Sequence, residues 1–262
     1  MKTFATAIVL TLVQFISSTS LAYILPLENI LQKSALVAGS SILNVEQEVQ
    51  FKEAGKTYII KETWLIEGDR NLRLTARGQG ELKEVNLNYI YNNKTRTSLS
   101  GKNKVTQTTG ADFYEKYLAI KSKDSFQSYL KDLAITENVR LSRASGSVCF
   151  AIGEEANSES AVKPQLWIDQ NSFRLVKMRL PSAAEVEFLD FTELESGAHY
   201  PRQKTVSWNG KTLNIVVKSV TRATSASIKN FYPESLETPS QFVLPPQNPA
   251  APVFEEFYQR FR

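Results

Sequence analysis

The sequence predicts an α+β protein that is mainly β, in which a curved antiparallel sheet of about eleven strands forms an open (incomplete) β-barrel. Apolar and polar residues alternate with a period of two over most of the chain, which is typical of strands with one covered face. Short runs separated by Gly, Asn and Asp turns indicate an antiparallel meander. Helical spacing at residues 26–38 and 111–135 predicts an N-terminal helix and a two-helix insert that acts as a lid.

The N-terminus has the features of a secretory signal peptide, which we place at residues 1–22. Lys2 precedes an apolar run at 4–16, and Ser20 and Ala22 supply the small residues before a cleavage point. A membrane anchor is the alternative, but a spanning helix needs roughly 20 apolar residues, more than this run offers. We therefore expect signal cleavage after Ala22 and a soluble protein that does not span a membrane and is secreted, with the bacterial periplasm as its compartment.

Residues 23–232 are expected to form one domain. In the expected strand at 58–66, Tyr58, Ile60, Trp64 and Ile66 share one parity, and Glu62 is the exception on that face. Asn-Gly is the strongest short-range hairpin signal, and it occurs at residues 209–210. The small, polar stretch at 154–163 predicts a mobile loop.

The helical insert at 111–135 interrupts the sheet pattern. The first helix is indicated by Phe113, Tyr117, Leu118 and Ile120. Asp124 is the expected N-cap of the second, whose apolar face would consist of Phe126, Tyr129, Leu130 and Leu133.

Residues 233–262 are expected to form a Pro-rich C-terminal arm. Six prolines between residues 233 and 252 indicate an extended, partly polyproline II-like chain. The end of the arm, 253–262, predicts a short amphipathic segment whose candidate partner-binding side chains are Phe254, Phe257, Tyr258 and Phe261. Because so short a helix is marginal alone, it either docks on the body or awaits a partner.

The sequence indicates no catalytic or metal chemistry. His199 is the only histidine and Cys149 the only cysteine, too few ligands for a zinc site, and we expect no cofactor and no enzymatic activity. Cys149 lies in an apolar run and is expected to be buried, whereas His199 is expected in a solvated turn. The net charge is +4, and Lys and Arg are interleaved with acids, which does not favour nucleic-acid binding.

Three short helices cannot easily cover so many one-faced strands. The sheet is therefore either doubled into a sandwich or curled around the helices, which would leave an apolar cleft suited to an acyl chain. The same residues would form a filled core if the interior is closed. The candidate lining residues are Tyr58, Ile60, Trp64, Ile66, Leu72, Leu74, Leu87, Tyr89, Phe188, Leu213, Ile215 and Val217.

The order of elements resembles the periplasmic carriers and outer-membrane acceptors of lipoproteins, the LolA/LolB-like group. The matching stretches are the helix at 26–38 followed by VEQEV at 45–49, then ETWLI at 62–66, YIYN at 89–92, LWID at 166–169, VEFLDF at 186–191 and YPR at 200–202. The resemblance covers roughly residues 26–240 and implies a curved antiparallel sheet with helices as a lid. It also implies a carrier role for lipidated or other apolar cargo.

Two functions remain open at this point. The first is a periplasmic carrier or acceptor whose partner is a lipidated protein or another acyl-chain ligand. The alternative is an envelope protein-interaction or stress-sensing module on the same fold, which would reach an envelope or membrane-protein partner through the arm. A structural protein with a filled core comes third. The sequence does not indicate the oligomeric state.

Overall fold

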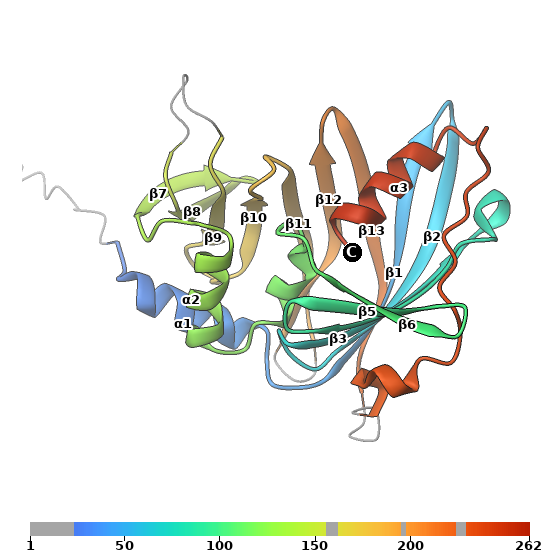
Figure 1. Cartoon of the computed structure of the whole chain (residues 1–262). Coiled ribbons are helices and arrows are strands. Elements are labelled where there is room, and N and C mark those ends of the chain that lie inside the picture. Colours follow the sequence, from blue (N-terminus) through green and yellow to red (C-terminus); the bar gives the residue numbers. More distant parts are fainter. Residues whose placement is uncertain (1–23, 156–161, 195–197, 224–228) are drawn as a thin grey trace, which may run out of the picture.

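The computed structural model describes residues 24–155, 162–194, 198–223 and 229–262, so the predicted cleavage site at Ala22 and residues 156–161 of the predicted polar loop lie outside it. Thirteen described strands form one strongly curved antiparallel sheet (Figure 1). The N-terminal strands are β1 (Leu43–Glu53), β2 (Lys56–Ile66), β3 (Asn71–Gly78), β4 (Asn86–Asn92), β5 (Thr95–Ser100) and β6 (Asn103–Thr108). The others are β7 (Val139–Ala144), β8 (Ser147–Ile152), β9 (Gln165–Asp169), β10 (Leu175–Arg179), β11 (Glu185–Glu193), β12 (His199–Trp208) and β13 (Lys211–Arg222).

The strand order is β6-β5-β4-β3-β2-β1-β13-β12-β11-β10-β9-β8-β7. Each meander, β1 to β6 and β7 to β13, pairs strands that follow one another in the chain, and the two meet only where β1 pairs with β13. We call this contact the β1–β13 seam. Strands β6 and β7 form the two free edges, so the barrel is open, as the sequence predicts.

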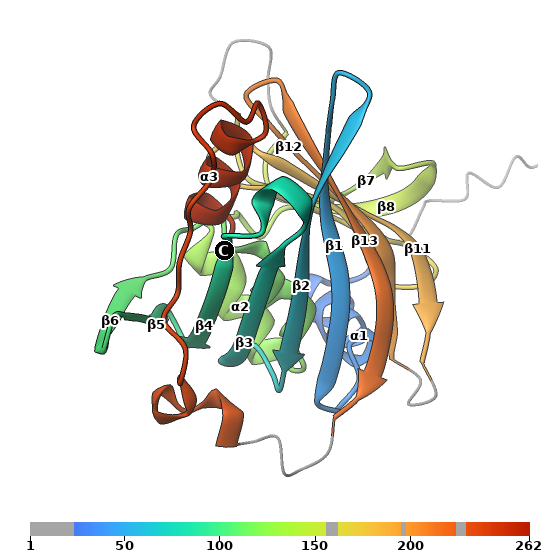
Figure 2. The same ribbon diagram turned by 90° about the vertical axis from the view of Figure 1, so that its right-hand side faces the viewer.

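The helices lie against the concave face of the sheet (Figures 1 and 2). Helix α1 (Leu27–Val37) packs beside α2 (Lys123–Asp132) over the half of the sheet that contains β7 to β11, together with the 3-10 helix η2 (Tyr114–Ala119). Helix α3 (Ala251–Arg260) lies over β12, β13, β1 and β2. Two further 3-10 turns are η1 (Gly80–Leu82) and η4 (Pro233–Ser235).

Alternation explains which side of each strand is buried. On β2 the even-numbered side chains from Tyr58 to Ile66 are buried and the odd-numbered ones lie toward solvent. The buried faces of both meanders and the helices join in one continuous core. At the β12–β13 hairpin, Asn209 and Gly210 both have positive φ, at 46° and 73°, which is the conformation that an Asn-Gly turn adopts.

The structure corrects four details of the sequence prediction. The sheet has thirteen strands rather than about eleven, because β6 and β7 were not expected. The first helix of the insert is a 3-10 helix, and the second is capped by Ser122, whose hydroxyl accepts a hydrogen bond from the Ser125 amide, rather than by Asp124. His199 begins β12 instead of lying in a turn. In the part of the chain that the structure describes, no helix is long and apolar enough to cross a membrane.

Candidate binding site on the concave face

The twelve residues predicted to line a cleft lie in, or pack against, the continuous core on the concave face. Eleven of them are buried, and Tyr89 is half-buried. Phe188 of β11 packs against the insert, where its ring lies 6.2 Å from that of Tyr114. The structure therefore brings the predicted set together, and the space that they face is occupied by the insert and by α3.

The C-terminal arm wraps around one edge of the sheet to reach the concave face (Figure 2). On the outer side, Leu236 packs against Ile90 and Leu99. The backbone of Gln241 then pairs with Asn86 at the part of β4 that β5 leaves uncovered, with N···O distances of 2.6 and 2.8 Å. Beyond this bridge the chain turns inward, so the arm is fastened on both sides of the sheet.

All four aromatic residues proposed as partner-binding, Phe254, Phe257, Tyr258 and Phe261, are buried beneath the arm's own helix. Phe254 meets Phe51 of β1 edge-on at 6.4 Å between ring centroids. The rings of Phe257 and Phe261 lie 6.1 and 5.2 Å from that of Trp208 on β12. Of the two outcomes that the sequence leaves open, docking on the body is the one observed.

Ion pairs hold the exposed side of α3. Glu256 lies 2.6 Å from the Lys211 ammonium and 2.7 Å from the Arg260 guanidinium. Arg260 also reaches Asp112 of the insert at 3.1 Å. Hydrogen bonding from Lys211 is the main reason that the pKa of Glu256 falls to about 2. These contacts connect α3 to β13 and to the insert.

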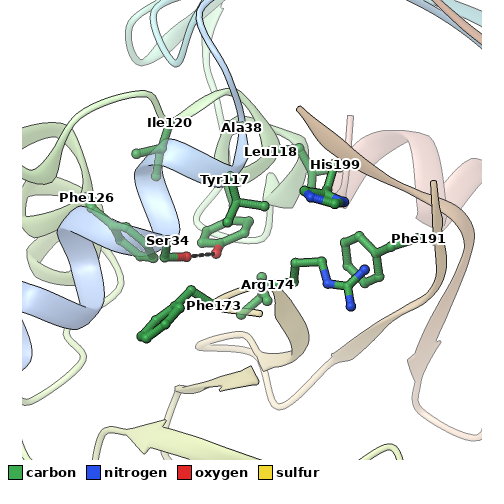
Figure 3. A pocket seen from close by; sticks show the side chains of 12 residues that line it. Ser34, Ala38, Tyr117, Leu118, Ile120, Phe126, Phe173, Arg174, Phe191 and His199 are labelled. Carbon is green, nitrogen blue, oxygen red and sulfur yellow. Dashed lines mark hydrogen bonds between the residues drawn. The ribbon is translucent and has the colours of Figure 1, made fainter. Parts of the chain in front are cut away.

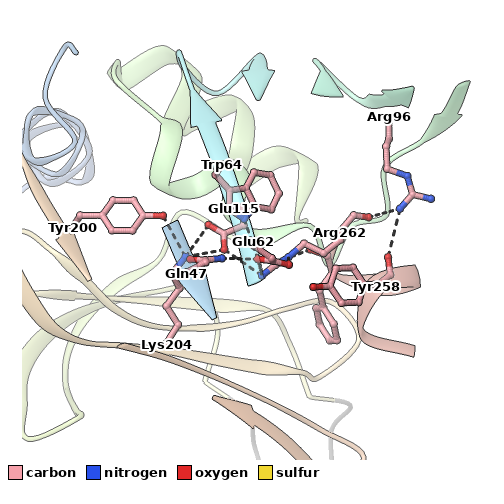
Figure 4. Close-up of polar contacts among 10 residues, drawn as sticks. Gln47, Glu62, Trp64, Arg96, Glu115, Tyr200, Lys204, Tyr258 and Arg262 are labelled. Atoms are coloured by element: carbon pink, nitrogen blue, oxygen red, sulfur yellow. Dashed lines mark hydrogen bonds and ion pairs between the residues drawn. The ribbon is translucent and has the colours of Figure 1, made fainter. Parts of the chain in front are cut away.

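A buried ionic cluster lies beneath the end of the arm (Figure 4). Its charged members are Glu62 of β2, Glu115 of η2, Lys204 of β12 and Arg262, and none of these side chains has any exposed surface. The Arg262 guanidinium donates two hydrogen bonds to the carboxylate of Glu62, at 2.9 and 3.2 Å. Lys204 donates to both oxygens of Glu115, at 2.8 and 3.0 Å. Two carboxylates thus face two cations.

Neutral groups complete the cluster. Gln47 and the Trp64 indole each donate a hydrogen bond to one oxygen of Glu62, at 2.6 and 3.0 Å. Lys204 also donates to the Tyr200 hydroxyl at 3.2 Å. The rings of Trp64, Tyr114 and Phe257 surround the Arg262 guanidinium, with centroids 5.3, 5.1 and 4.6 Å from its carbon, a cation–π arrangement.

The electrostatics of the cluster follow from burial and pairing. Burial disfavours the ionised form of Glu62, but the charge of Arg262 and the hydrogen bonds from Arg262, Gln47 and Trp64 together outweigh it and hold the pKa of Glu62 below its ordinary value. Burial also acts to lower the pKa of Arg262, yet Glu62, with smaller contributions from Tyr114 and Glu115, raises it well above its ordinary value. For Lys204 the effect of burial prevails over Glu115, and its pKa is lowered.

Of the four charged members of this cluster, sequence reasoning singled out only one. Glu62 stood out because it interrupts the apolar parity of β2, and the structure shows that its side chain is buried there all the same. Lys204 lies on the buried face of β12 between Tyr200 and Val206, so the same reasoning applied to that strand would have found it. Glu115 lies in the 3-10 helix η2 and Arg262 lies two residues beyond the end of α3, so no two-residue alternation exists to reveal them.

A small cavity lies apart from this cluster, between α1, the insert and the ends of β10 and β12 (Figure 3). Ser34 and the Tyr117 hydroxyl form a hydrogen bond of 3.1 Å at its wall. The half-buried His199 also lines it, so the prediction of a solvated turn histidine is wrong. The free volume of about 30 Å³ is enough for one or two water molecules but not for an acyl chain.

The remaining chemistry-bearing residue is Cys149, which is buried on β8, as the sequence predicts. Burial raises the pKa of its thiol to about 11, so the thiolate is scarce at neutral pH. Within residues 24–155, 162–194, 198–223 and 229–262, no group of three or more His, Cys, Asp or Glu side chains is arranged to hold a metal ion.

Comparison with known proteins finds similar structures but no similar sequences. No family model matches the chain. No curated protein sequence matches it either. Solved structures match over most of its length. A LolA superfamily protein from Nitrosomonas europaea has a TM-score of 0.55 at 11% identity, covering 81% of this chain and all of that one.

Two further structures agree with the first. A domain named as an outer membrane lipoprotein-sorting protein from Vibrio parahaemolyticus has a TM-score of 0.55 at 12% identity, over 79% of this chain and 97% of its own. A DUF1329 family protein from Desulfovibrio piger has a TM-score of 0.55 at 11% identity, over 80% of this chain and 98% of its own. The chain therefore has a LolA-like fold, as the sequence pattern predicts.

Proposed function

We propose that this protein is a non-catalytic binding protein of the bacterial envelope that takes apolar cargo, such as the acyl chains of a lipidated protein, on its concave face. The expected signal peptide at residues 1–22 and the LolA-like fold support this proposal. The twelve predicted lining residues, from Tyr58 to Val217, are the proposed apolar contacts.

The observation that carries the proposal is the way the concave face is covered. Over β12, β13, β1 and β2 the cover is a single ten-residue helix, α3, at the end of an extended arm rather than a second sheet. Its aromatic side chains fill the space that an acyl chain would need. Detachment of α3 would expose contiguous aromatic and aliphatic surface, and apolar surface removed from water is what drives the binding of an acyl chain.

The test is native mass spectrometry of the protein purified from the secreted fraction, with lipid extraction in parallel. We expect a co-purifying acyl species, or uptake of an acylated peptide by the delipidated protein. The variant Arg262→Gln, which weakens the hold on α3, should take up more ligand than the native chain. Glu48→Gln is the matched control, because Glu48 lies on the opposite face of β1, paired with Lys218.

If neither the native chain nor Arg262→Gln binds any acylated ligand, the proposal fails, and the concave face is a filled core.

The alternative is an envelope protein-interaction or stress-sensing module that acts through its arm. The observation that favours it is the arm itself, since Phe254, Phe257, Tyr258 and Phe261 form one apolar face that a partner groove would receive after release. A chain that lacks residues 240–262 should then lose partner capture and retain ligand uptake. The opposite result, with capture intact and uptake lost, would contradict this role.

A further inference from the structure

Two buried carboxylates, Glu62 and Glu115, lie beneath the end of the arm. We propose that Glu62 and Glu115, with the rings of Trp64 and Tyr114, form a head-group site for a cation. The ligand of the concave face would then be an amphiphile that joins an apolar chain to a guanidinium or primary ammonium head. This inference rests on the proposed function, because it names the class of cargo for the same face.

Charge balance is the first argument. With α3 in place, two carboxylates face two cations in a region without solvent contact. When α3 leaves, Arg262 leaves with it, and Lys204 stays committed to Glu115 at 2.8 and 3.0 Å. Among the described residues Glu62 has no ion-pair partner other than Arg262. A ligand entering this space therefore meets an uncompensated carboxylate, which favours a cationic head and repels an anionic one.

Geometry is the second argument, because Arg262 already shows how a head group would sit. Its Nε and one terminal nitrogen reach separate oxygens of Glu62 at 2.9 and 3.2 Å, and the same terminal nitrogen lies 3.4 Å from Glu115. A guanidinium head would repeat this bidentate pairing, and a primary ammonium could donate separate N–H groups to the same carboxylate oxygens. The rings of Trp64 and Tyr114, which both face the guanidinium of Arg262, stay behind when α3 leaves.

The path of the apolar chain follows from the side chains next to Arg262. Phe261 and Phe257 lead from the ionic cluster to Trp208, with ring centroids at 5.2 and 6.1 Å. A linear chain that starts at the head-group site would take the space that Phe257 and Phe261 leave, against the ring of Trp208. The ligand thus reproduces the end of the arm, a cation followed by apolar groups.

The experiment compares amphiphiles that share one dodecyl chain and differ only in the head. The probes are dodecylguanidinium, dodecylammonium, dodecyltrimethylammonium, dodecyl maltoside and dodecanoate, each below its micelle concentration. Binding is measured by titration calorimetry on the full mature chain and on Arg262→Gln. Protease cleavage within residues 236–250 is followed in parallel, because a ligand that takes the place of Arg262 must release the arm.

We expect the guanidinium and primary ammonium probes to bind about tenfold or more tightly than the maltoside, since a hydrogen bond to a charged group contributes about 1.5–3 kcal/mol. The quaternary ammonium, which has no N–H to donate, should rank below them, and dodecanoate should rank last. In Glu62→Gln the preference for the cationic heads should fall toward that of the neutral probe. The control Glu48→Gln should keep the full preference.

The outcomes separate this inference from the proposed function. Equal binding of all heads, or a preference for dodecanoate, overturns the head-group site and leaves an apolar carrier in place. Failure of every probe, the neutral maltoside included, overturns both. The ranking on the native chain does not depend on any variant, so a folding defect in Glu62→Gln, checked by circular dichroism, would leave the test valid.

Discussion

Replacing Arg262 by Met removes a buried positive charge while keeping an apolar side chain of similar length in the same place. The substitution leaves Glu62 ionised, without solvent contact, and held only by the neutral donors Gln47 and Trp64. Removal of one partner from a buried pair typically costs about 3–5 kcal/mol, because the other charge stays desolvated. We expect a loss of free energy of unfolding in this range.

The assay is urea denaturation followed by tryptophan fluorescence, since Trp64 and Trp208 both lie next to the end of the arm. If the free energy of unfolding falls by about 3 kcal/mol per molar urea, the expected loss of stability lowers the urea midpoint by roughly 1–1.7 M. An unchanged slope would show that α3 is still docked. A smaller slope would show that the native state of the variant has released its helix.

The double variant Glu62→Gln/Arg262→Met decides the interpretation. It removes both charges and leaves the Glu115–Lys204 pair balanced, so most of the stability lost in Arg262→Met should return. Two results would refute the reasoning. One is a loss below about 1 kcal/mol in the single variant, as for exposed pairs. The other is a double variant no more stable than Arg262→Met.

Three other predictions follow from the charged and titratable groups. The folded pKa of Glu62 lies below its ordinary value of 4.5, so the contribution of this carboxylate to stability is complete above about pH 4.5 and is lost as the pH falls through the folded pKa. The urea midpoint should therefore drop as the pH is lowered below about 4.5. The drop should be less steep in Glu62→Gln. Glu256→Gln breaks the half-exposed ion pair with Lys211 and should lower the free energy of unfolding by less than about 1 kcal/mol in the same urea titration. A loss as large as that in Arg262→Met would contradict the expectation that buried ion pairs matter more than exposed ones. The thiol of Cys149, with its pKa raised to about 11, should react with a disulfide reagent at pH 8 only slowly in the folded protein and rapidly in urea; rapid reaction of the native chain would show that β8 opens easily.

Most of the sheet could be predicted because burial alternates with sequence position in most strands. The strand pattern fails where that contrast is absent. All six residues of β6 are exposed, and β7 has no fully buried residue, so neither strand carries an apolar parity. Both are edge strands, where pairing on one side alone holds the backbone in place.

The site was predictable only in part. The parity of β2 pointed to Glu62 as an anomaly, but its partner Arg262 lies 200 positions away. The periodicity of a strand predicts which face of the sheet a side chain lies on, but it does not predict which distant element packs on that face. The same limit applies to the arm, because the spacing of Phe254, Phe257, Tyr258 and Phe261 indicates an apolar helix face equally well for docking and for partner binding. His199 was misjudged for a related reason, since the start of β12 was placed three residues too late.

The β1–β13 seam gives the folding reaction an order. Every other strand pair joins neighbours in the chain, so both meanders can form by local hairpins, whereas the seam must bring Leu43 and Arg222 together across most of the sequence. Such non-local pairing is slow, because loop entropy is lost before contacts compensate for it. The end of the arm contacts both sides of this seam, through Arg262 with Glu62 on β2 and through Phe261 with Trp208 on β12, so its full set of contacts can form only after the seam has closed. Docking of the arm should therefore be the last step of folding and the first to reverse during unfolding.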